Sequence, residues 1–329
     1  MGRIFVRFVI LFGALFLCGE AWCADSNNTM VRKEEFLGEE LKVVGLSDFP
    51  PFSQYDRFDA QNFQMRNVFW KPLQNALQRY TLELQSVKLT KKQMSSKNLL
   101  IGMREGIYQL FLGAYSDSKQ FSGIVPIYPA VISNPIHIIG LAEVQEKIKD
   151  TKDLAKLNGV VCKCEYLSDF AWRKIKDLKL EYVETPLEAY ERIFTGKADY
   201  LIGSWYYNRI ISSRYGLEHY LTASKKPLFK IPVFMAMSKL TPKLSEYVRI
   251  FQKISENPQF AIDIKNEILR EVETEVQKNV GIVPPSFAQK AEENVSQDDD
   301  VVDEKIEIKG RVVEKQEEQK SIDEVLEGI

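Results

Sequence analysis

The stretch from residue 151 to residue 205 constrains the fold most, because short apolar segments alternate there with segments of helical period. Strands and helices are expected to alternate, starting with a strand, over residues 160–164, 168–178, 180–183, 187–195 and 198–203. This order is typical of a parallel α/β sheet, and such sheets bind ligands beyond the carboxyl ends of their strands. The segments 165–168 and 204–207, which follow two of these strands, are therefore the first candidates for a binding site.

The N-terminal half of the chain repeats this order. Strands are expected over 41–46, 82–89 and 108–113, with helices over 68–80 and 98–107 between them. Two similar halves predict a two-lobed α/β protein. Two extended segments, 126–141 and 227–237, connect the halves, and paired crossovers of this kind form a hinge about which two lobes can close on a ligand.

The expected domain limits follow from these elements. Residues 36–130 and 236–274 form the first lobe, and residues 131–235 form the second lobe together with the hinge strands. Outside the lobes we expect a signal peptide over residues 1–23 and an acidic, disordered tail over residues 275–329.

The first 23 residues have the layout of a secretory signal peptide. Arg3 and Arg7 precede an apolar run over residues 8–18, which is shorter than the ~20 residues that a membrane span needs. Small residues stand where a signal peptidase would cleave after Cys23. A lipid anchor on Cys18 or Cys23 is not expected, because each follows a bulky residue. We therefore expect export to the periplasm, with an uncleaved membrane anchor as the alternative.

The C-terminal end differs in composition from the rest of the chain. Residues 291–329 contain 14 acidic side chains against five basic ones and no aromatic residue. Such a segment cannot bury enough apolar surface to offset the entropy of ordering it, so we expect a solvated tail. The rest of the chain is net basic, with 39 basic and 32 acidic side chains. This excess is compatible with an anionic ligand, with an anionic cell surface or with simple charge drift.

Two cysteines remain after the expected cleavage, Cys162 and Cys164. On a regular strand, residues i and i+2 lie near the largest Cα separation that a disulfide tolerates. We therefore expect two small thiols, buried or half-buried, in preference to a disulfide. Because His137 and His219 are the only histidines of the chain, the ligands that would complete a metal site with these thiols are lacking. No metal and no cofactor is expected.

Four segments together resemble a known family. They are LKVVGLSDFPPF at 41–52, MREGIYQLFLGAYSDSK at 103–119, KDTKDLAKLNGVV at 149–161 and TPLEAYERIFTGKADYLIGS at 185–204. Their order and spacing resemble the bacterial family 3 extracellular solute-binding proteins, the polar amino-acid-binding type of periplasmic receptor. The resemblance implies a type II periplasmic-binding fold whose two lobes close on a small solute, and delivery of that solute to an ABC permease in the inner membrane.

The departures from this family concern the ligand contacts. Where relatives hold the ligand carboxylate with a Thr-x-x-Arg loop, this chain has Ser116 to Lys119, and lysine cannot offer the bidentate fork of arginine. Ser204 stands where relatives place the acidic partner of the ligand's amino group, and Gln109 replaces an aspartate. The loop after Val161 reads Cys164-Glu165-Tyr166 in place of a Gly-Ser/Thr loop. The resemblance therefore implies a small anionic or neutral solute, and not an ordinary α-amino acid.

The candidate ligand-binding residues come from the loops that follow the strands. Aromatic walls are expected from four residues, Phe49, Phe52, Tyr115 and Trp205, and further contacts from six, Ser116, Lys119, Glu165, Tyr166, Ser168 and Ser204. Phe49 and Phe52 lie on a proline-stiffened loop, where they either contact a flat ligand or pack on their own lobe.

Two other functions stay open at this point. The acidic tail, which the family's transport receptors lack, motivates a sensor or envelope interaction protein on the same fold. An enzyme of the dehydratase type would use Glu165 or Asp117 as a general acid, but no carboxylate pair or carboxylate–histidine set has the spacing that this chemistry requires. We expect a monomer without enzymatic activity whose partners are a small solute and a permease, and no nucleic acid.

Overall fold

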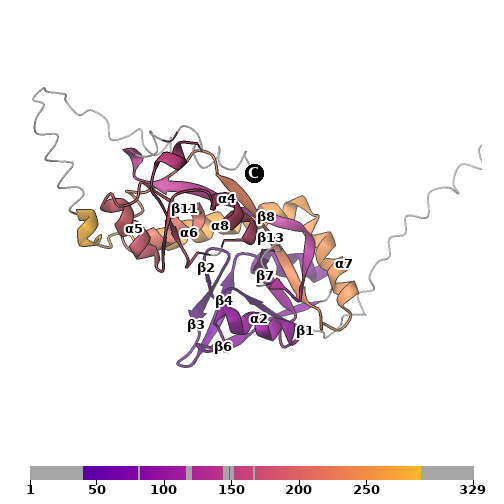
Figure 1. Ribbon diagram of the computed structural model, residues 1–329. Coiled ribbons are helices and arrows are strands. Elements are labelled where there is room, and N and C mark those ends of the chain that lie inside the picture. Colours follow the sequence, from indigo (N-terminus) through magenta and orange to yellow (C-terminus); the bar gives the residue numbers. More distant parts are fainter. Residues whose placement is uncertain are drawn as a thin grey trace, which may run out of the picture.

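The computed structural model describes residues 40–80, 82–115, 121–143, 148, 152–165 and 167–289. The expected signal peptide and the tail after Gln289 lie outside these residues. Figure 1 shows two bodies joined by the long strands β8 and β13, with β1 to β7 in the lower body and α4, α5, α6 and β11 in the upper one. The α/β class and the two-lobed architecture predicted from the sequence are confirmed.

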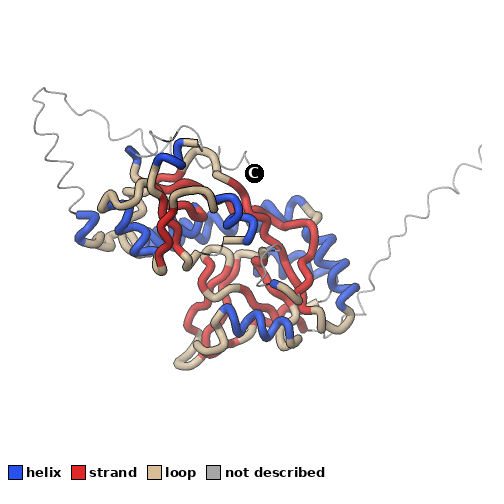
Figure 2. The backbone as a smooth tube through the Cα atoms, viewed as in Figure 1, coloured by secondary structure: helices blue, strands red, loops and turns tan. Residues whose placement is uncertain are grey.

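One nine-stranded sheet runs through both lobes (Figure 2). Its order is β10-β9-β11-β8-β13-β7-β1-β5, and β12 pairs with β8. Lobe 1 contributes β1 (Glu40–Gly45), β5 (Glu83–Ser86) and β7 (Leu110–Ala114). Lobe 2 contributes β9 (Gly159–Cys162), β10 (Leu180–Val183), β11 (Tyr200–Ser204) and β12 (Thr222–Ala223). Within each lobe β1 pairs in parallel with β5 and β7, and β9 with β10 and β11, as the alternation of strands and helices predicts.

A second, antiparallel sheet of lobe 1 was not predicted. It consists of β2 (Asp48–Phe49), β3 (Ser53–Arg57), β4 (Asn62–Asn67) and β6 (Lys88–Thr90). The segment expected to be one strand over 82–89 is divided between the two sheets, because β5 pairs with β1 and β6 pairs with β4. The expected loop at residues 47–52 is instead the start of this small sheet.

The helices flank the sheets, and several of them begin at a residue whose side chain caps the first turn. They are α1 (Trp70–Leu77), a 3₁₀ turn (Gln78–Tyr80), α2 (Ser96–Arg104), a 3₁₀ turn (Asp153–Lys156), α4 (Asp169–Ile175), α5 (Pro186–Phe194), α6 (Trp205–Ser213), α7 (Leu244–Ser255) and α8 (Pro258–Lys278). At the start of α5, the side chains of Thr185 and Glu188 form a capping box and Pro186 occupies the first turn. Ser95, Ser168 and Ser204 cap α2, α4 and α6.

Two long antiparallel strands connect the lobes, β8 (Ile124–Gly140) and β13 (Phe229–Ser238). The last third of β8 pairs with β11 of lobe 2. The first residues of β8 pair with the end of β13, which itself pairs with β7 of lobe 1. Both strands therefore pass from one lobe to the other, as expected for the hinge.

The C-terminal part makes a third crossing, which the sequence did not predict. α8 packs against α1 and α7 on the side of lobe 1 and against α6 of lobe 2. Beyond α8, the ring of Phe287 lies 5.6 Å from that of Phe194 in lobe 2, and Ala288 is fully buried. The ordered body therefore continues to residue 289, past residue 275 where we expected the tail to begin, because residues 276–288 still supply apolar side chains to the core.

A polar network joins both lobes to α8. The guanidinium of Arg66 in β4 lies 2.6 Å from Glu271 and 3.0 Å from Glu275, both in α8. Gln54 of β3 donates to Glu271 at 2.9 Å and accepts from Arg214, the residue after α6, at 3.2 Å. Arg214 also lies 3.5 Å from Glu275. Lobe 1, α8 and lobe 2 are thus connected by half-buried ion pairs in addition to the hinge strands.

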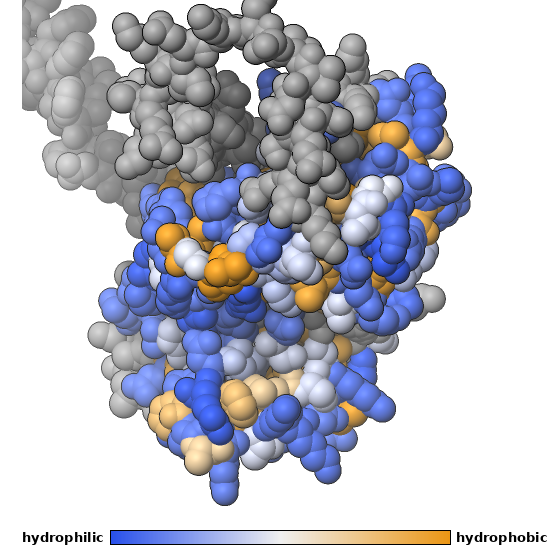
Figure 3. Space-filling view, turned by 90° about the vertical axis from the view of Figure 1, so that its left-hand side faces the viewer, coloured by the Kyte–Doolittle hydropathy of each residue, from blue (hydrophilic) through white to orange (hydrophobic). Residues whose placement is uncertain are grey.

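The apolar side chains that stabilise the two lobes lie inside them. The largest fully buried side chains include Phe69 and Phe111 in lobe 1 and Tyr190 and Tyr200 in lobe 2. On the face shown in Figure 3, the described surface is mostly hydrophilic and its apolar side chains form small separate groups. No helix among the described residues is both long and apolar enough to cross a membrane.

Candidate functional site

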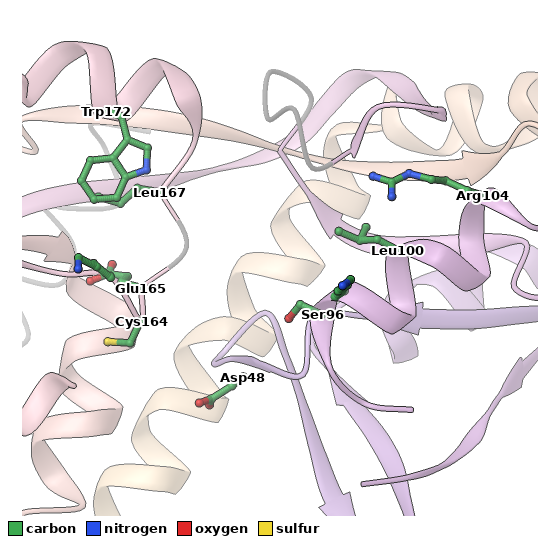
Figure 4. A pocket seen from close by; sticks show the side chains of 10 residues that line it. Asp48, Ser96, Leu100, Arg104, Cys164, Glu165, Leu167 and Trp172 are labelled. Atoms are coloured by element: carbon green, nitrogen blue, oxygen red, sulfur yellow. The ribbon is translucent and has the colours of Figure 1, made fainter. Parts of the chain in front are cut away.

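A pocket of about 700 Å³ lies between the two lobes. Lobe 1 lines it with five side chains, Asp48, Ser96, Lys97, Leu100 and Arg104. Lobe 2 lines it with five more, Lys163, Cys164, Glu165, Leu167 and Trp172. Figure 4 shows these two groups facing each other across an open space. The pocket therefore lies where closure about the hinge would bring the lobes together.

Most of the lobe 1 wall is formed by α2, with Asp48 of β2 beside it. Ser96, Leu100 and Arg104 follow one another at intervals of four residues, so they lie on the same side of the helix. Ser95 caps the helix by accepting a hydrogen bond from the N–H of Asn98 at 3.3 Å. Arg104 is positioned by a hydrogen bond of 2.9 Å from its Nε to the carbonyl of Ser122. In Figure 4 its guanidinium points toward lobe 2.

The lobe 2 wall is the turn after β9 together with the start of α4. Residues 163–165 form the turn, and Trp172 stands on α4 with its ring 5.9 Å from that of Tyr182. Lys163 forms an ion pair of 2.6 Å with Glu184, outside the pocket. This wall thus combines an aromatic surface with a cation held at its edge.

Glu165 is the most buried ionisable group of the pocket wall, with 4 % of its surface exposed. Burial raises the pKa of Glu165 to about 8, although hydrogen bonds from the Ser204 N–H and the Asn208 amide favour the ionised form. The carboxyl group is therefore protonated at neutral pH. A Cβ atom on Gly203 would collide with its Oε2, so the glycine makes room for this carboxyl group.

The charges around the pocket favour an anion. The lining residues include three basic side chains, Lys97, Arg104 and Lys163, and two acidic ones, Asp48 and Glu165. Lys163 is already paired with Glu184, so the excess of positive charge comes from Lys97 and Arg104 of α2. Glu165 adds no charge there, because its pKa lies near 8. A cleft lined by an excess of one charge attracts solutes of the opposite charge.

A chain of buried hydrogen bonds leads from Glu165 to the hinge. Ser204, whose N–H donates to Glu165, donates its hydroxyl to Oδ1 of Asn134 in β8 at 2.7 Å. The amide of Asn134 in turn donates to the hydroxyl of Tyr115 in lobe 1 at 2.9 Å. All of these groups are buried, and a break would leave a polar group unpaired. The pocket wall of lobe 2 is therefore tied to the hinge strand and to lobe 1.

The structure places several expected site residues in the interior rather than at the pocket. Phe49, Phe52 and Tyr115 form a buried aromatic cluster, with ring centroids 5.0 Å apart for the two phenylalanines and 5.6 Å apart for Phe49 and Tyr115. These three residues therefore do not form aromatic walls of the pocket, as we had expected. The two phenylalanines pack within their own lobe, which was the alternative expectation for them.

The other expected residues are distributed as follows. Glu165 lines the pocket. Ser168 and Ser204 are fully buried and accept hydrogen bonds from the first turns of α4 and α6, so their hydroxyls serve as helix caps. Trp205 is half-buried against the core. Three more, Ser116, Lys119 and Tyr166, lie outside the described residues.

Sequence reasoning missed the lobe 1 wall and Trp172. A signal was available, because Ser96, Leu100 and Arg104 have helical spacing, and the last two lie within the helix predicted over residues 98–107. The family resemblance directed attention to the strand ends instead. Trp172 has no comparable signal, since one aromatic residue on a short helix is most often part of the core.

The expectation of two free thiols is wrong. Cys162 and Cys164 form a disulfide, with their Cα atoms 5.1 Å apart. The reason is local: β9 ends at Cys162, and Lys163 and Cys164 lie in a turn, which brings residues i and i+2 closer than a regular strand would. Among the described residues, no group of three potential ligand side chains is arranged to hold a metal ion.

No family model matches the sequence, and no curated protein matches it. Solved structures of similar fold do exist. The periplasmic VFT2 domain of BvgS from Bordetella pertussis matches with a TM-score of 0.51 and 18 % identity over 70 % of this chain and 93 % of that domain. A putative binding component of an ABC transporter from Wolinella succinogenes, in complex with lysine, matches with a TM-score of 0.52 and 16 % identity over 72 % of this chain and 97 % of that one. The chain therefore has the two-lobed fold of periplasmic binding proteins, as the resemblance implied.

Proposed function

We propose that this protein is an exported solute-binding protein whose two lobes close on a small anionic or neutral solute and which serves ABC-type uptake. The observation that carries the proposal is the pocket between the lobes, about 700 Å³ in volume, which is lined by Lys97 and Arg104 of α2 against the carboxylate of Asp48. A volume of this size suits a small molecule. The charge excess favours an anion over the cationic amino acid bound by the Wolinella succinogenes protein.

The solute would be held from both sides. Arg104 and Lys97 from α2 would neutralise an anionic group, and Trp172 from α4 would cover an apolar face of the solute. Lys119, in the loop where related receptors hold a ligand carboxylate, would add a further cation. Because both walls contribute, closure about β8 and β13 would complete the site.

Export to the periplasm fits the signal-peptide pattern at the N-terminus. The acceptor of the solute would be a permease of the inner membrane, in keeping with the ABC-transporter protein that shares the fold. We propose a monomer without enzymatic activity. No histidine is among the described residues that line the pocket with Glu165, so the pocket lacks the carboxylate–histidine set that general acid–base catalysis commonly uses.

A second candidate is a sensor or envelope interaction protein without a transport role. Two observations favour it. One is the similarity to a periplasmic domain of BvgS, which is not named as a transport component. The other is the acidic composition of residues 291–329. This candidate shares the solute-binding cleft but needs no permease.

A thermal-shift screen tests the proposal. A ligand that binds only the folded state raises its stability as the ligand concentration exceeds Kd. We expect small carboxylates or phosphate monoesters to raise Tm, and amines of similar size to have no effect. The variant Lys97→Gln/Arg104→Gln should lose the response, while Lys71→Gln, an exposed lysine of α1 away from the pocket, should keep it. A response confined to amines would contradict the anionic solute.

A further inference from the structure

The disulfide between Cys162 and Cys164 is part of the pocket wall. It spans a single residue, Lys163, at the end of β9. Cys164 and Lys163 both line the pocket, and Glu165 follows directly. Figure 4 shows Cys164 beside Glu165 on the lobe 2 side of the cleft. Solute binding as proposed above gives this disulfide no role.

The two sulfur-bearing residues differ in their access to solvent. Cys162 is buried at the end of the strand, with 3 % of its surface exposed. Cys164 is only half-buried and borders a pocket large enough for a small molecule. Thiol–disulfide exchange depends on access to the attacked sulfur, so a small thiol in the cleft reaches the Cys164 residue before Cys162.

The surroundings also favour one direction of bond cleavage. The backbone N–H of Cys164 donates a hydrogen bond to Sγ of Cys162 at 3.2 Å. A thiolate released at Cys162 would accept that hydrogen bond more strongly than a disulfide sulfur does. Exchange is faster when the departing thiolate is stabilised. From the described residues, Sγ of Cys164 accepts only the longer hydrogen bond from the hydroxyl of Tyr207, at 3.8 Å. The nearer donor therefore makes Cys162 the better leaving group, and access makes Cys164 the better site of attack.

The fold does not depend on this bond. A disulfide stabilises a protein by limiting the freedom of the unfolded chain, and the effect is smallest for the shortest loops. This loop contains one intervening residue. β9 is held independently by its pairing with β10 and β11. Opening the disulfide should therefore change the turn at 163–165 and leave the sheet intact.

We propose that the Cys162–Cys164 disulfide is a thiol-exchange site that opens onto the cleft, and that its substrate is a small-molecule thiol. The thiolate of that molecule attacks Sγ of Cys164 and forms a new S–S bond. The bond to Cys162 breaks, and its electron pair leaves on Sγ of Cys162 as a thiolate. A second thiol molecule can then attack the mixed disulfide, which releases the small-molecule disulfide and leaves Cys164 as a thiolate.

The exchange would alter the binding site. In the disulfide form the short ring fixes the turn that carries Lys163 and Glu165 into the pocket wall. In the opened form the turn is free of this constraint, and a mixed disulfide on Cys164 would occupy part of the cleft. The redox state of the pair thereby sets the shape of the lobe 2 wall.

The experiment is done on the intact, folded protein with glutathione as the probe thiol, followed by alkylation and peptide mass spectrometry. We expect the rate at which glutathione opens the disulfide in the folded protein to be within about tenfold of the rate in urea. Glutathione should be found attached to Cys164. Circular dichroism should show that the fold persists. A disulfide that resists glutathione in the folded protein but reacts in urea would overturn the proposal, as would attachment mainly to Cys162.

A matched pair of variants tests the choice of sulfur. Cys162→Ser leaves Cys164 as the free thiol, and Cys164→Ser leaves Cys162. With an aromatic disulfide reagent, the thiol of Cys164 should react about ten times faster than that of Cys162 in the folded protein, and at the same rate in urea. Equal rates in the folded protein would contradict the proposal. If a variant does not fold, the glutathione reaction of the wild-type protein still tests whether Cys164 is the site of attack. Neither readout requires a bound solute, so failure here leaves the solute-binding proposal unaffected.

Discussion

Replacing Glu165 by glutamine should change how the stability of the protein depends on pH. Burial raises the pKa of this carboxyl group from 4.5 to about 8 in the folded protein. Between these two values the folded state binds a proton that the unfolded state does not bind, so the free energy of unfolding falls as the pH rises. Above the folded pKa both states are ionised, and the loss is complete.

The size of this effect follows from the two pKa values. One pKa unit corresponds to about 1.4 kcal/mol, so the change from 4.5 to about 8 corresponds to at most about 5 kcal/mol of unfolding free energy. Glutamine cannot ionise and has almost the same shape. Near pH 5, Glu165→Gln should cost about 1 kcal/mol, because its amide fits the amide of Asn208 less well than a carboxyl oxygen does. Near pH 9 the variant should be the more stable protein.

Urea unfolding at a series of pH values between about 5 and 9 measures this difference directly. The exposed residue Glu105, at the end of α2, offers a matched control, and Glu105→Gln should keep the wild-type pH profile. A Glu165→Gln profile parallel to that of the wild type would refute the reasoning. In that case the carboxyl group would be ionised in the folded protein, and the charge of the pocket would be more negative than we infer.

Three further substitutions test other parts of the account. Arg66→Gln removes the cation between Glu271 and Glu275, whose side chains are 15 % and 9 % exposed. Because Arg66 itself is 31 % exposed, we expect urea unfolding to show a decrease of about 1–3 kcal/mol in the free energy of unfolding. A decrease no larger than that of Lys71→Gln would refute a stabilising role for this ion pair. Gly203→Ala places a methyl group against Oε2 of Glu165, so thermal denaturation should show a decrease of about 1–3 kcal/mol in the free energy of unfolding. An unchanged Tm would mean that Glu165 is not packed against Gly203. Lys119→Ala should lower the affinity for an anionic solute about ten- to a hundredfold, as measured by calorimetric titration. An unchanged affinity would show that this loop is not part of the site.

The order of elements could be read from the sequence because local patterns specify it. The apolar strand at 198–203, the Thr185–Glu188 capping signal and the helical periodicity of 187–195 correspond to β11 and α5 with small shifts at the ends. The pairing of strands that are distant in the sequence could not be predicted in the same way. The division of 82–89 into β5 and β6 depends on partners far away in the sequence, which no local pattern encodes.

The site was harder to predict because burial decides it. Phe49 and Phe52 have the same sequence context whether they face a ligand or each other, and the structure stacks them in the core. Ser204 lies where a ligand contact was expected, but its hydroxyl and N–H are used by Asn134 and Glu165. The disulfide depended on a turn at residues 163–164 that strand periodicity did not reveal.

The central claim is that the two lobes close on a small anion, and the distance between the lobes tests it most directly. Fluorophores attached to Lys92→Cys, just before α2, and Lys176→Cys, just after α4, would lie on the exposed sides of the two pocket walls. We predict that a carboxylate or phosphate monoester that raises Tm also increases energy transfer between the fluorophores, and that the increase saturates with its concentration. Energy transfer that stays constant while such an anion binds, or that responds only to amines, would contradict the account.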